Sequence, residues 1–100
     1  MRSQITPRRS SVPRMIDTNV GRGMSYYAKK DLESAIADYT QAIRLNPRDI
    51  RAYLHRAIAF TAKRDADRAI ADYDEAIQRS LQFKEAYLGR GSAYRVKGGP

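Results

Sequence analysis

Apolar residues recur every three or four positions along most of this chain. One stretch shows the pattern clearly and contains Ala35, Ile36, Tyr39, Ala42 and Ile43. This spacing places the apolar side chains on one face of an α-helix and the polar ones on the other. Asp31 precedes the stretch and is a favoured helix N-cap, whereas Asn46 and Pro47 follow it and disfavour further helix. The pattern therefore predicts a helix between residues 31 and 46.

The same pattern returns 34 residues later. The pentapeptide AIADY stands at residues 35–39 and again at 69–73, where Asp65 is the matching N-cap. The tripeptide AYL stands at residues 52–54 and again at 86–88, so a third unit begins. Further helical stretches at about 17–29, 50–63 and 84–97 complete five predicted helices, and no stretch shows the alternation typical of a strand. A fixed period of this length predicts stacked copies of one helical unit.

The period also divides the chain. Residues 1–15 are rich in Arg, Ser and Pro and poor in apolar residues, so we expect a flexible basic tail there. A repeat domain is expected at 16–97, and a disordered end at 98–100, where two glycines and a proline stop the last helix. The domain comprises three units, at 16–49, 50–83 and 84–97.

The net charge of +8 is spread unevenly over the 100 residues. Residues 1–15 hold four arginines and no acidic residue, and residues 84–100 hold four basic residues and one acidic residue. The nearly balanced middle lacks the basic stripe typical of a nucleic-acid-binding surface. The chain has no cysteine and no apolar run near the roughly 20 residues of a membrane helix. We therefore expect a cytoplasmic protein that does not insert into a membrane.

The sequence holds no set of residues typical of an enzyme. His55 is the single histidine, and local spacing places no Ser, Cys or acidic residue beside it as a catalytic partner. Asp65, Asp67 and the acidic cluster at 72–75 fall in helical segments and lack the glycine and terminal glutamate of a calcium loop. We expect no catalytic residue, no metal site and no cofactor.

The repeated motif resembles that of the tetratricopeptide repeat family. The second unit shows it best, with Tyr53, Arg56, Ala57, Phe60, Ala69, Tyr73 and Ala76 at the family's spacings. The resemblance covers residues 16–97, as two full repeats and the first helix of a third. It implies an all-α fold, a right-handed superhelical α-α solenoid of antiparallel helix pairs.

Small and large residues alternate where the helices of such a solenoid must meet. Gly23, Ala57 and Gly91 leave room on the first helix of each unit, and Tyr39 and Tyr73 on the second helices are expected to pack toward the next unit. Large side chains packed against small ones fix how closely two helices approach.

Three arginines depart from the family's pattern, because Arg22, Arg56 and Arg90 occupy a position that usually holds leucine. A charge at such a position must be paired or must reach solvent. Asp38 and Asp72, in the two copies of the pentapeptide, are the expected partners, within a repeat or between adjacent repeats. Unpaired arginines exposed to solvent are the alternative.

Members of the family hold a peptide or helix of another protein in a concave groove lined by the first helix of each repeat. The matching residues here are Val20, Met24, Tyr27, Arg51, Leu54, His55, Ile58, Thr61, Leu88, Ser92 and Arg95. This largely apolar surface suits an amphipathic helix or an apolar peptide. The resemblance therefore implies a non-enzymatic scaffold for protein–protein interaction.

The resemblance disfavours one specificity known in the family. Members that bind chaperone tails clamp a C-terminal carboxylate with a cluster of Lys, Asn and Arg. The matching positions of this chain hold Val20, Met24, His55, Glu85 and Gly89.

Two further hypotheses stay open. A nucleic-acid-associated protein would use the basic N-terminal tail and the basic C-terminal helix, although most tyrosines occupy core positions of the repeat and are poorly placed to stack on bases. Two and a half repeats also leave one side of the last helix uncovered, so the chain either self-associates or is a piece of a longer array.

Overall fold

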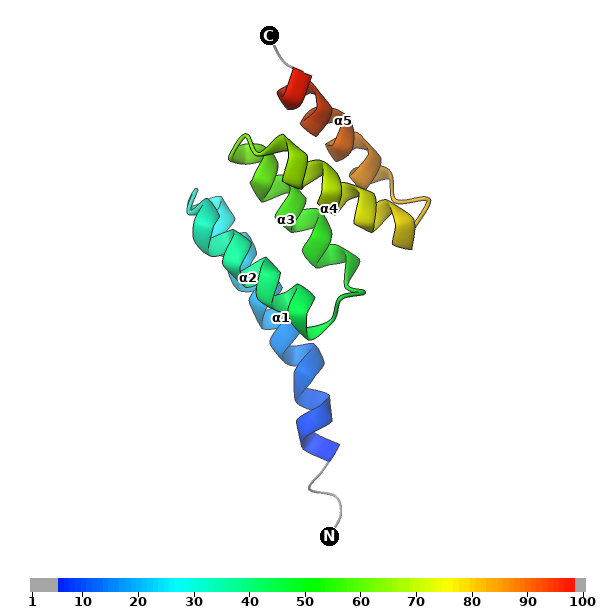
Figure 1. The fold of residues 1–100 in the computed structure, drawn as a ribbon. Coiled ribbons are helices and arrows are strands. Elements are labelled where there is room, and N and C mark those ends of the chain that lie inside the picture. Colours follow the sequence, from blue (N-terminus) through cyan, green and yellow to red (C-terminus); the bar gives the residue numbers. More distant parts are fainter. Residues whose placement is uncertain (1–5, 99–100) are drawn as a thin grey trace.

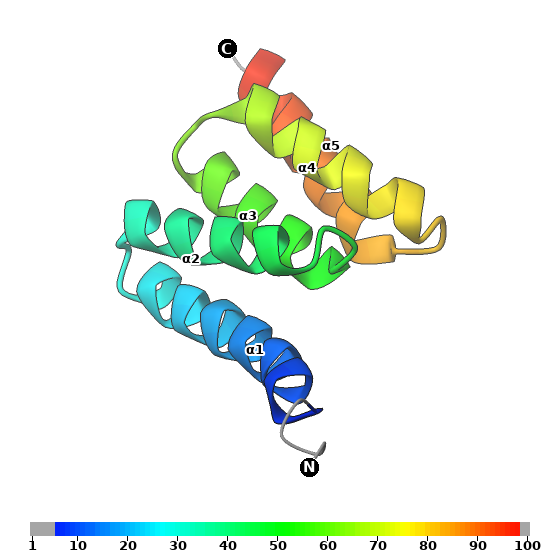
Figure 2. The same cartoon turned by 60° about the horizontal axis from the view of Figure 1, so that its bottom comes forward.

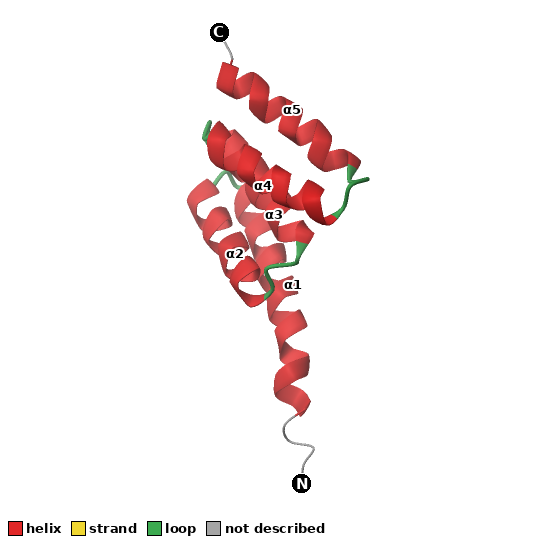
Figure 3. Ribbon diagram, turned by 45° about the vertical axis from the view of Figure 1, so that its right-hand side comes forward, coloured by secondary structure: helices red, strands yellow, loops and turns green. Residues whose placement is uncertain are grey.

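Five helices make up the part of the chain that the structure, a computed structural model, describes: residues 6–98, with side chains from residue 12 onward (Figure 1). The helices are α1 (Thr6–Ala28), α2 (Leu32–Leu45), α3 (Ile50–Ala62), α4 (Ala66–Arg79) and α5 (Lys84–Gly98). Every regular element within this range is a helix (Figure 3), which confirms the predicted all-α fold. No helix in the same range combines the length and the apolar character that crossing a bilayer would require.

The helices stack in sequence order as antiparallel pairs. α1 packs on α2 and α3 packs on α4, while α5 continues the stack against α4 (Figures 1 and 2). α3 also contacts α1 and α5, so the first helices of the three units lie next to one another. The described part of the chain measures 63 × 30 × 17 Å. This elongated stack of helix pairs is the architecture of a helical solenoid.

Aspartates begin the second helix of each full repeat, as the sequence predicts. The carboxylates of Asp31 and Asp65 accept hydrogen bonds from backbone N–H groups three residues later and so cap α2 and α4. Lys30 and Arg64 stand just before these caps with φ angles of 68° and 69°. This left-handed conformation turns the chain sharply, so the second helix folds back on the first.

α1 begins earlier than the sequence predicted. We expected a helix from about residue 17 after a flexible tail, but the helix starts at Thr6 and includes Pro13. Val12 packs against the cluster of Ile16 and Val20, which extends the apolar stripe by one helical turn. Residues 1–5 lie outside the described residues, and the division between tail and repeat domain stays a prediction.

The core is built from small side chains and a few aromatic ones. Tyr39 is the largest fully buried side chain, and Tyr53, Phe60 and Tyr73 are buried beside alanines of the neighbouring helices. Because the alanines have short side chains, the helix backbones approach closely and the aromatic rings fill the remaining space. The fully buried alanines are Ala35, Ala42, Ala52, Ala57, Ala59, Ala69, Ala76, Ala86 and Ala93.

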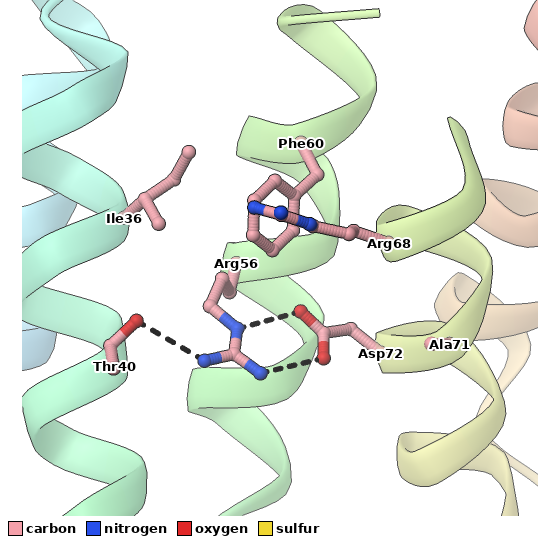
Figure 4. Close-up of a pocket in the computed structure, with 7 residues that line it drawn as sticks. All are labelled: Ile36, Thr40, Arg56, Phe60, Arg68, Ala71 and Asp72. Carbon is pink, nitrogen blue, oxygen red and sulfur yellow. Dashed lines mark hydrogen bonds and ion pairs between the residues drawn. The ribbon is translucent and has the colours of Figure 1, made fainter. Parts of the chain in front are cut away.

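Arg56 joins three helices through its guanidinium (Figure 4). Its Nε and Nη2 donate to the two carboxylate oxygens of Asp72 on α4, at 2.7 and 2.8 Å, and its Nη1 donates to the hydroxyl of Thr40 on α2, at 3.1 Å. The side chains of Arg56 and Asp72 are only 20% and 8% exposed. The hydrogen bonds to Asp72 raise the pKa of Arg56, so the guanidinium stays ionised although it is largely buried. The ion pair sits in a hollow of about 390 Å³ lined also by Ile36, Phe60, Arg68 and Ala71.

The other two arginines are paired in different ways. Arg22 repeats the arrangement one unit earlier, with its Nε and Nη2 donating to Asp38 at 2.9 and 2.8 Å, although its side chain is mostly exposed. Arg90 instead donates through Nη1 to Asp74 at 2.7 Å. The expectation that a pentapeptide aspartate would pair with Arg90 is therefore wrong, because Asp72 is held by Arg56 and the sequence has no third copy of the pentapeptide.

A double-mutant cycle on Arg56 and Asp72 tests the role of this pair. We expect Asp72→Ala to lower the free energy of unfolding by about 2–3 kcal/mol, because it leaves a half-buried guanidinium without its carboxylate. Arg56→Leu combined with Asp72→Ala should be more stable than Asp72→Ala alone, since the unpaired charge is gone. Urea unfolding followed by circular dichroism measures the cycle, and strictly additive losses would contradict the account.

Candidate peptide-binding groove

A pocket of about 250 Å³ opens between the first helices of the two full repeats. It is lined by Met24 and Tyr27 of α1, His55 and Ile58 of α3, and Tyr39 of α2. Met24 and Tyr27 are three residues apart, as are His55 and Ile58, so each pair lies on one face of its helix. The lining is apolar apart from the imidazole and the two phenol hydroxyls.

Tyr39 reaches this pocket because Gly23 leaves room for its ring. A Cβ atom on Gly23 would lie 2.6 Å from Cε1 of Tyr39, a distance that real contacts do not tolerate. Beyond Gly23, the ring of Tyr39 stacks on His55 of the next repeat, with centroids 5.7 Å apart and planes inclined by 22°. Burial raises the pKa of Tyr39 to about 12, so its phenol stays neutral at physiological pH.

The same contact recurs one repeat later. A Cβ atom on Gly89 of α5 would lie 2.4 Å from the ring of Tyr73. The tyrosine of each pentapeptide thus packs onto the first helix of the following unit, at His55 in one case and at Gly89 in the other. This contact sets the spacing between neighbouring first helices and therefore the width of the groove.

Arg51, one of the predicted groove residues, forms part of an ion-pair network between α1 and the start of α3. Its Nη2 lies 2.9 Å from a carboxylate oxygen of Asp17 on α1 and 2.8 Å from one of Asp49, at the start of α3. The hydrogen bonds raise the pKa of Arg51 and lower that of Asp49. Since two carboxylates of the chain already hold this guanidinium, it links α1 to α3 and is poorly placed to clamp a carboxylate of a ligand.

The structure brings four of the predicted groove residues together in the pocket: Met24, Tyr27, His55 and Ile58. The prediction that Val20 lines the groove is wrong. Val20 is only 4% exposed and packs with Ile16, Ala42 and Ala52 between α1, α2 and α3. The sequence correctly placed Val20 on the first helix of the repeat, but it did not show which side of that helix packs against α3.

The remaining predicted groove residues lie outside this pocket. Leu54 is half-buried and packs against the core cluster of α3, α4 and α5, and Thr61 donates its hydroxyl to the carbonyl of Ala57 at 2.9 Å. On α5, Leu88 is exposed, and Arg95 donates to the hydroxyl of Ser92 at 3.3 Å. Tyr39 is the pocket residue that our groove prediction omitted, because its spacing marked it only as a packing residue.

The groove continues beyond Tyr27 toward the turns that join the helices. A second hollow of about 440 Å³ is lined by Tyr27, Ala28, Lys30, Leu32 and Ala62. Tyr27 borders both hollows, so they lie next to each other along the chain's surface. Within residues 6–98, no cluster of three or more His, Cys, Asp or Glu is placed to hold a metal ion.

Stacked helix pairs, a repeated contact between small residues and tyrosines, and an apolar concave surface define a helical repeat protein. Family models agree with this class: one described as TPR repeat matches residues 23–63, and one described as tetratricopeptide repeat matches residues 50–83. The chain belongs to the tetratricopeptide repeat family.

Several solved structures are similar to this chain. The TPR domain of Arabidopsis OM64 is 28% identical, with a TM-score of 0.82 over 85% of this chain and 70% of that one. The TPR2B domain of yeast Sti1, solved as a complex with pHsp70, is 29% identical, with a TM-score of 0.80 over 85% and 67%. The second TPR domain of human RPAP3 shares the fold, with a TM-score of 0.83 over 87% and 72% at 23% identity. A comparison with curated proteins found no match.

His55 makes the free energy of unfolding depend on pH. Burial, together with the nearby charge of Arg51, lowers the pKa of His55 below its ordinary value of 6.5. The folded state therefore disfavours the protonated ring: the contribution of neutral His55 to stability is fully present above about pH 6.5 and is lost as the pH falls through that value toward the lower folded pKa.

We expect the free energy of unfolding to fall more between about pH 7.5 and about pH 5 in the native chain than in a His55→Gln variant, which cannot titrate there. Urea unfolding at both pH values measures the difference. The effect of titrating carboxylates is the same in both proteins and cancels in the comparison. Equal losses of stability would therefore contradict a His55 pKa that folding lowers.

Proposed function

We propose that this protein is an interaction module that binds an apolar peptide or an amphipathic helix of another protein in the concave groove between α1 and α3. The observation that carries the proposal is the pocket of Met24, Tyr27, Tyr39, His55 and Ile58. Met24 and Tyr27 remain well exposed although they are large and apolar. Large apolar side chains that line a concave surface are typical anchors for a partner's apolar residues.

The similarity to the TPR2B domain of yeast Sti1, which was solved with pHsp70, supports a protein partner. The groove chemistry favours an apolar anchor over a terminal carboxylate. Arg51 is neutralised by Asp17 and Asp49, and Glu85 adds a negative charge at a position where the carboxylate-binding members carry a clamp residue. A ligand with two or three apolar side chains on one helical face fits these features better than an acidic tail.

Two methionines of α1 provide a matched pair of variants. Met24 lines the pocket and Met15 does not, yet both side chains are 47% exposed. Peptides selected from a phage-displayed library on the full chain should carry apolar residues at helical spacing. Met24→Glu should weaken their binding by about tenfold or more, because it places a charge in the apolar contact, whereas Met15→Glu should leave it unchanged. Fluorescence anisotropy with labelled peptides measures both.

Two outcomes would count against the proposal. Selected peptides that end in an acidic carboxylate and ignore Met24→Glu would indicate a carboxylate clamp. Binding of a homopolymeric RNA that falls steeply with salt, with no peptide selected, would favour the nucleic-acid hypothesis. No catalytic activity is part of the proposal, and a cytoplasmic location stays a prediction.

A further inference from the structure

The hollow around Arg56 and Asp72, called here the α2–α4 hollow, is enclosed by interior helices of the stack. α2, α3 and α4 each pack against the helix before and the helix after them, so the hollow does not depend on either end of the stack. In Figure 4, α3 lies between α2 and α4. The seven lining residues are Ile36, Thr40, Arg56, Phe60, Arg68, Ala71 and Asp72.

The α2–α4 hollow and the groove pocket open on different faces of α3. Arg56 and Phe60 are four residues apart and share one face, whereas His55 and Ile58 share another. No residue lines both the hollow and the pocket. A ligand of the hollow would therefore leave the groove accessible.

The charges that line the hollow do not balance. Two arginines stand against one aspartate, and Asp72 is already bound by Nε and Nη2 of Arg56. Nη1 of Arg56 meets the neutral hydroxyl of Thr40, whereas Nη1 of Arg90 in the next unit meets the carboxylate of Asp74, 34 positions after Thr40. The lining of the hollow thus keeps a net charge of +1, which is carried by Arg68.

Arg68 has no close carboxylate of its own. Its guanidinium lies over the ring of Phe60, 5.8 Å from the centroid (Figure 4). Its Nε is 3.5 Å from a carboxylate oxygen of Asp65, which is longer than an ordinary hydrogen bond, and 73% of its side chain is exposed. Because a charge-assisted hydrogen bond is stronger than an exposed cation–π contact, Arg68 can turn toward an incoming carboxylate.

The other carboxylates of α4 are held by cations of the chain itself. These pairs, with N–O distances of 2.7–2.8 Å, are Asp67 with Lys97, Asp74 with Arg90, and Glu75 with Arg79. A carboxylate for Arg68 therefore has to come from outside the chain. The net charge of +8 would attract an acidic partner from a distance.

We propose that the α2–α4 hollow is a second binding site, which takes an acidic segment of a partner protein. An aspartate or glutamate of this segment binds Arg68, and a neighbouring apolar side chain packs on Ile36, Phe60 and Ala71. Apolar surroundings screen the ion pair less than water does. The proposal does not depend on the function proposed for the groove.

A matched pair of short peptides tests the site. A capped tetrapeptide that alternates glutamate and leucine is titrated into the full chain labelled with ¹⁵N, and the second peptide has glutamine in place of glutamate. We expect saturable NMR shifts at the Nε–H of Arg68 and at the amides of Ile36 and Ala71, and none at Met24. The glutamine peptide should bind at least about fivefold more weakly, because it lacks the charge that Arg68 recognises.

Two pairs of variants locate the contact. Arg68→Gln should remove the preference for glutamate, whereas Arg14→Gln, which changes the net charge equally on exposed α1, should retain it. Ala71→Leu should fill the hollow and abolish the shifts. Ala37→Leu should not, although Ala37 is the equivalent exposed residue of the first pentapeptide. Met24→Glu should leave the titration unchanged, which separates this site from the groove.

Three results would overturn the proposal. The first is an absence of shifts at the hollow, or shifts confined to the groove. The second is equal affinity for the glutamate and glutamine peptides, or glutamate binding that survives both Arg68→Gln and Ala71→Leu. The third is an equal response of Arg68 to inorganic phosphate at the same concentration, because the hollow would then bind anions without recognising a peptide.

Discussion

The contact on which the rest of the structure depends is the insertion of one tyrosine between two repeats. The ring of Tyr39, on α2, packs against Gly23 of its own repeat and stacks on His55 of the next. Tyr73 makes the corresponding approach to Gly89. Because the ring fills the space between close-packed helix backbones, it fixes both the pairing within a repeat and the step to the next one.

The arginine–aspartate pairs neutralise charged side chains that lie within this packing. A charged side chain stands where the family usually places leucine, and Arg56 is kept there by Asp72 and Thr40, from helices on either side of it. The pair therefore adds directional contacts to a core composed mainly of alanine. Without it, only the shapes of the packed side chains would fix how neighbouring helices align along one another. The pentapeptide has both functions, since its tyrosine packs against the next repeat and its aspartate neutralises an arginine of the first helix.

Much of this fold could be predicted from the sequence because it depends on local period and spacing. The 34-residue repeat, the apolar stripes and the capping aspartates are all local signals, and they predicted five helices. The start of α1 could not be predicted, because Val12 joins the core despite the neighbouring Pro13. Tertiary packing also decides the burial of Val20, the pairing of Arg51 with Asp17 across two helices, and the pairing of Arg90 with Asp74.

The most direct test of this account is whether the ring of Tyr39 bridges two repeats in solution. In a two-dimensional nuclear Overhauser spectrum, the account predicts cross-peaks from the aromatic protons of Tyr39 both to the Hα protons of Gly23 and to the imidazole protons of His55. Cross-peaks to only one of these residues, or a Tyr39 ring that flips rapidly in contact with solvent, would contradict it.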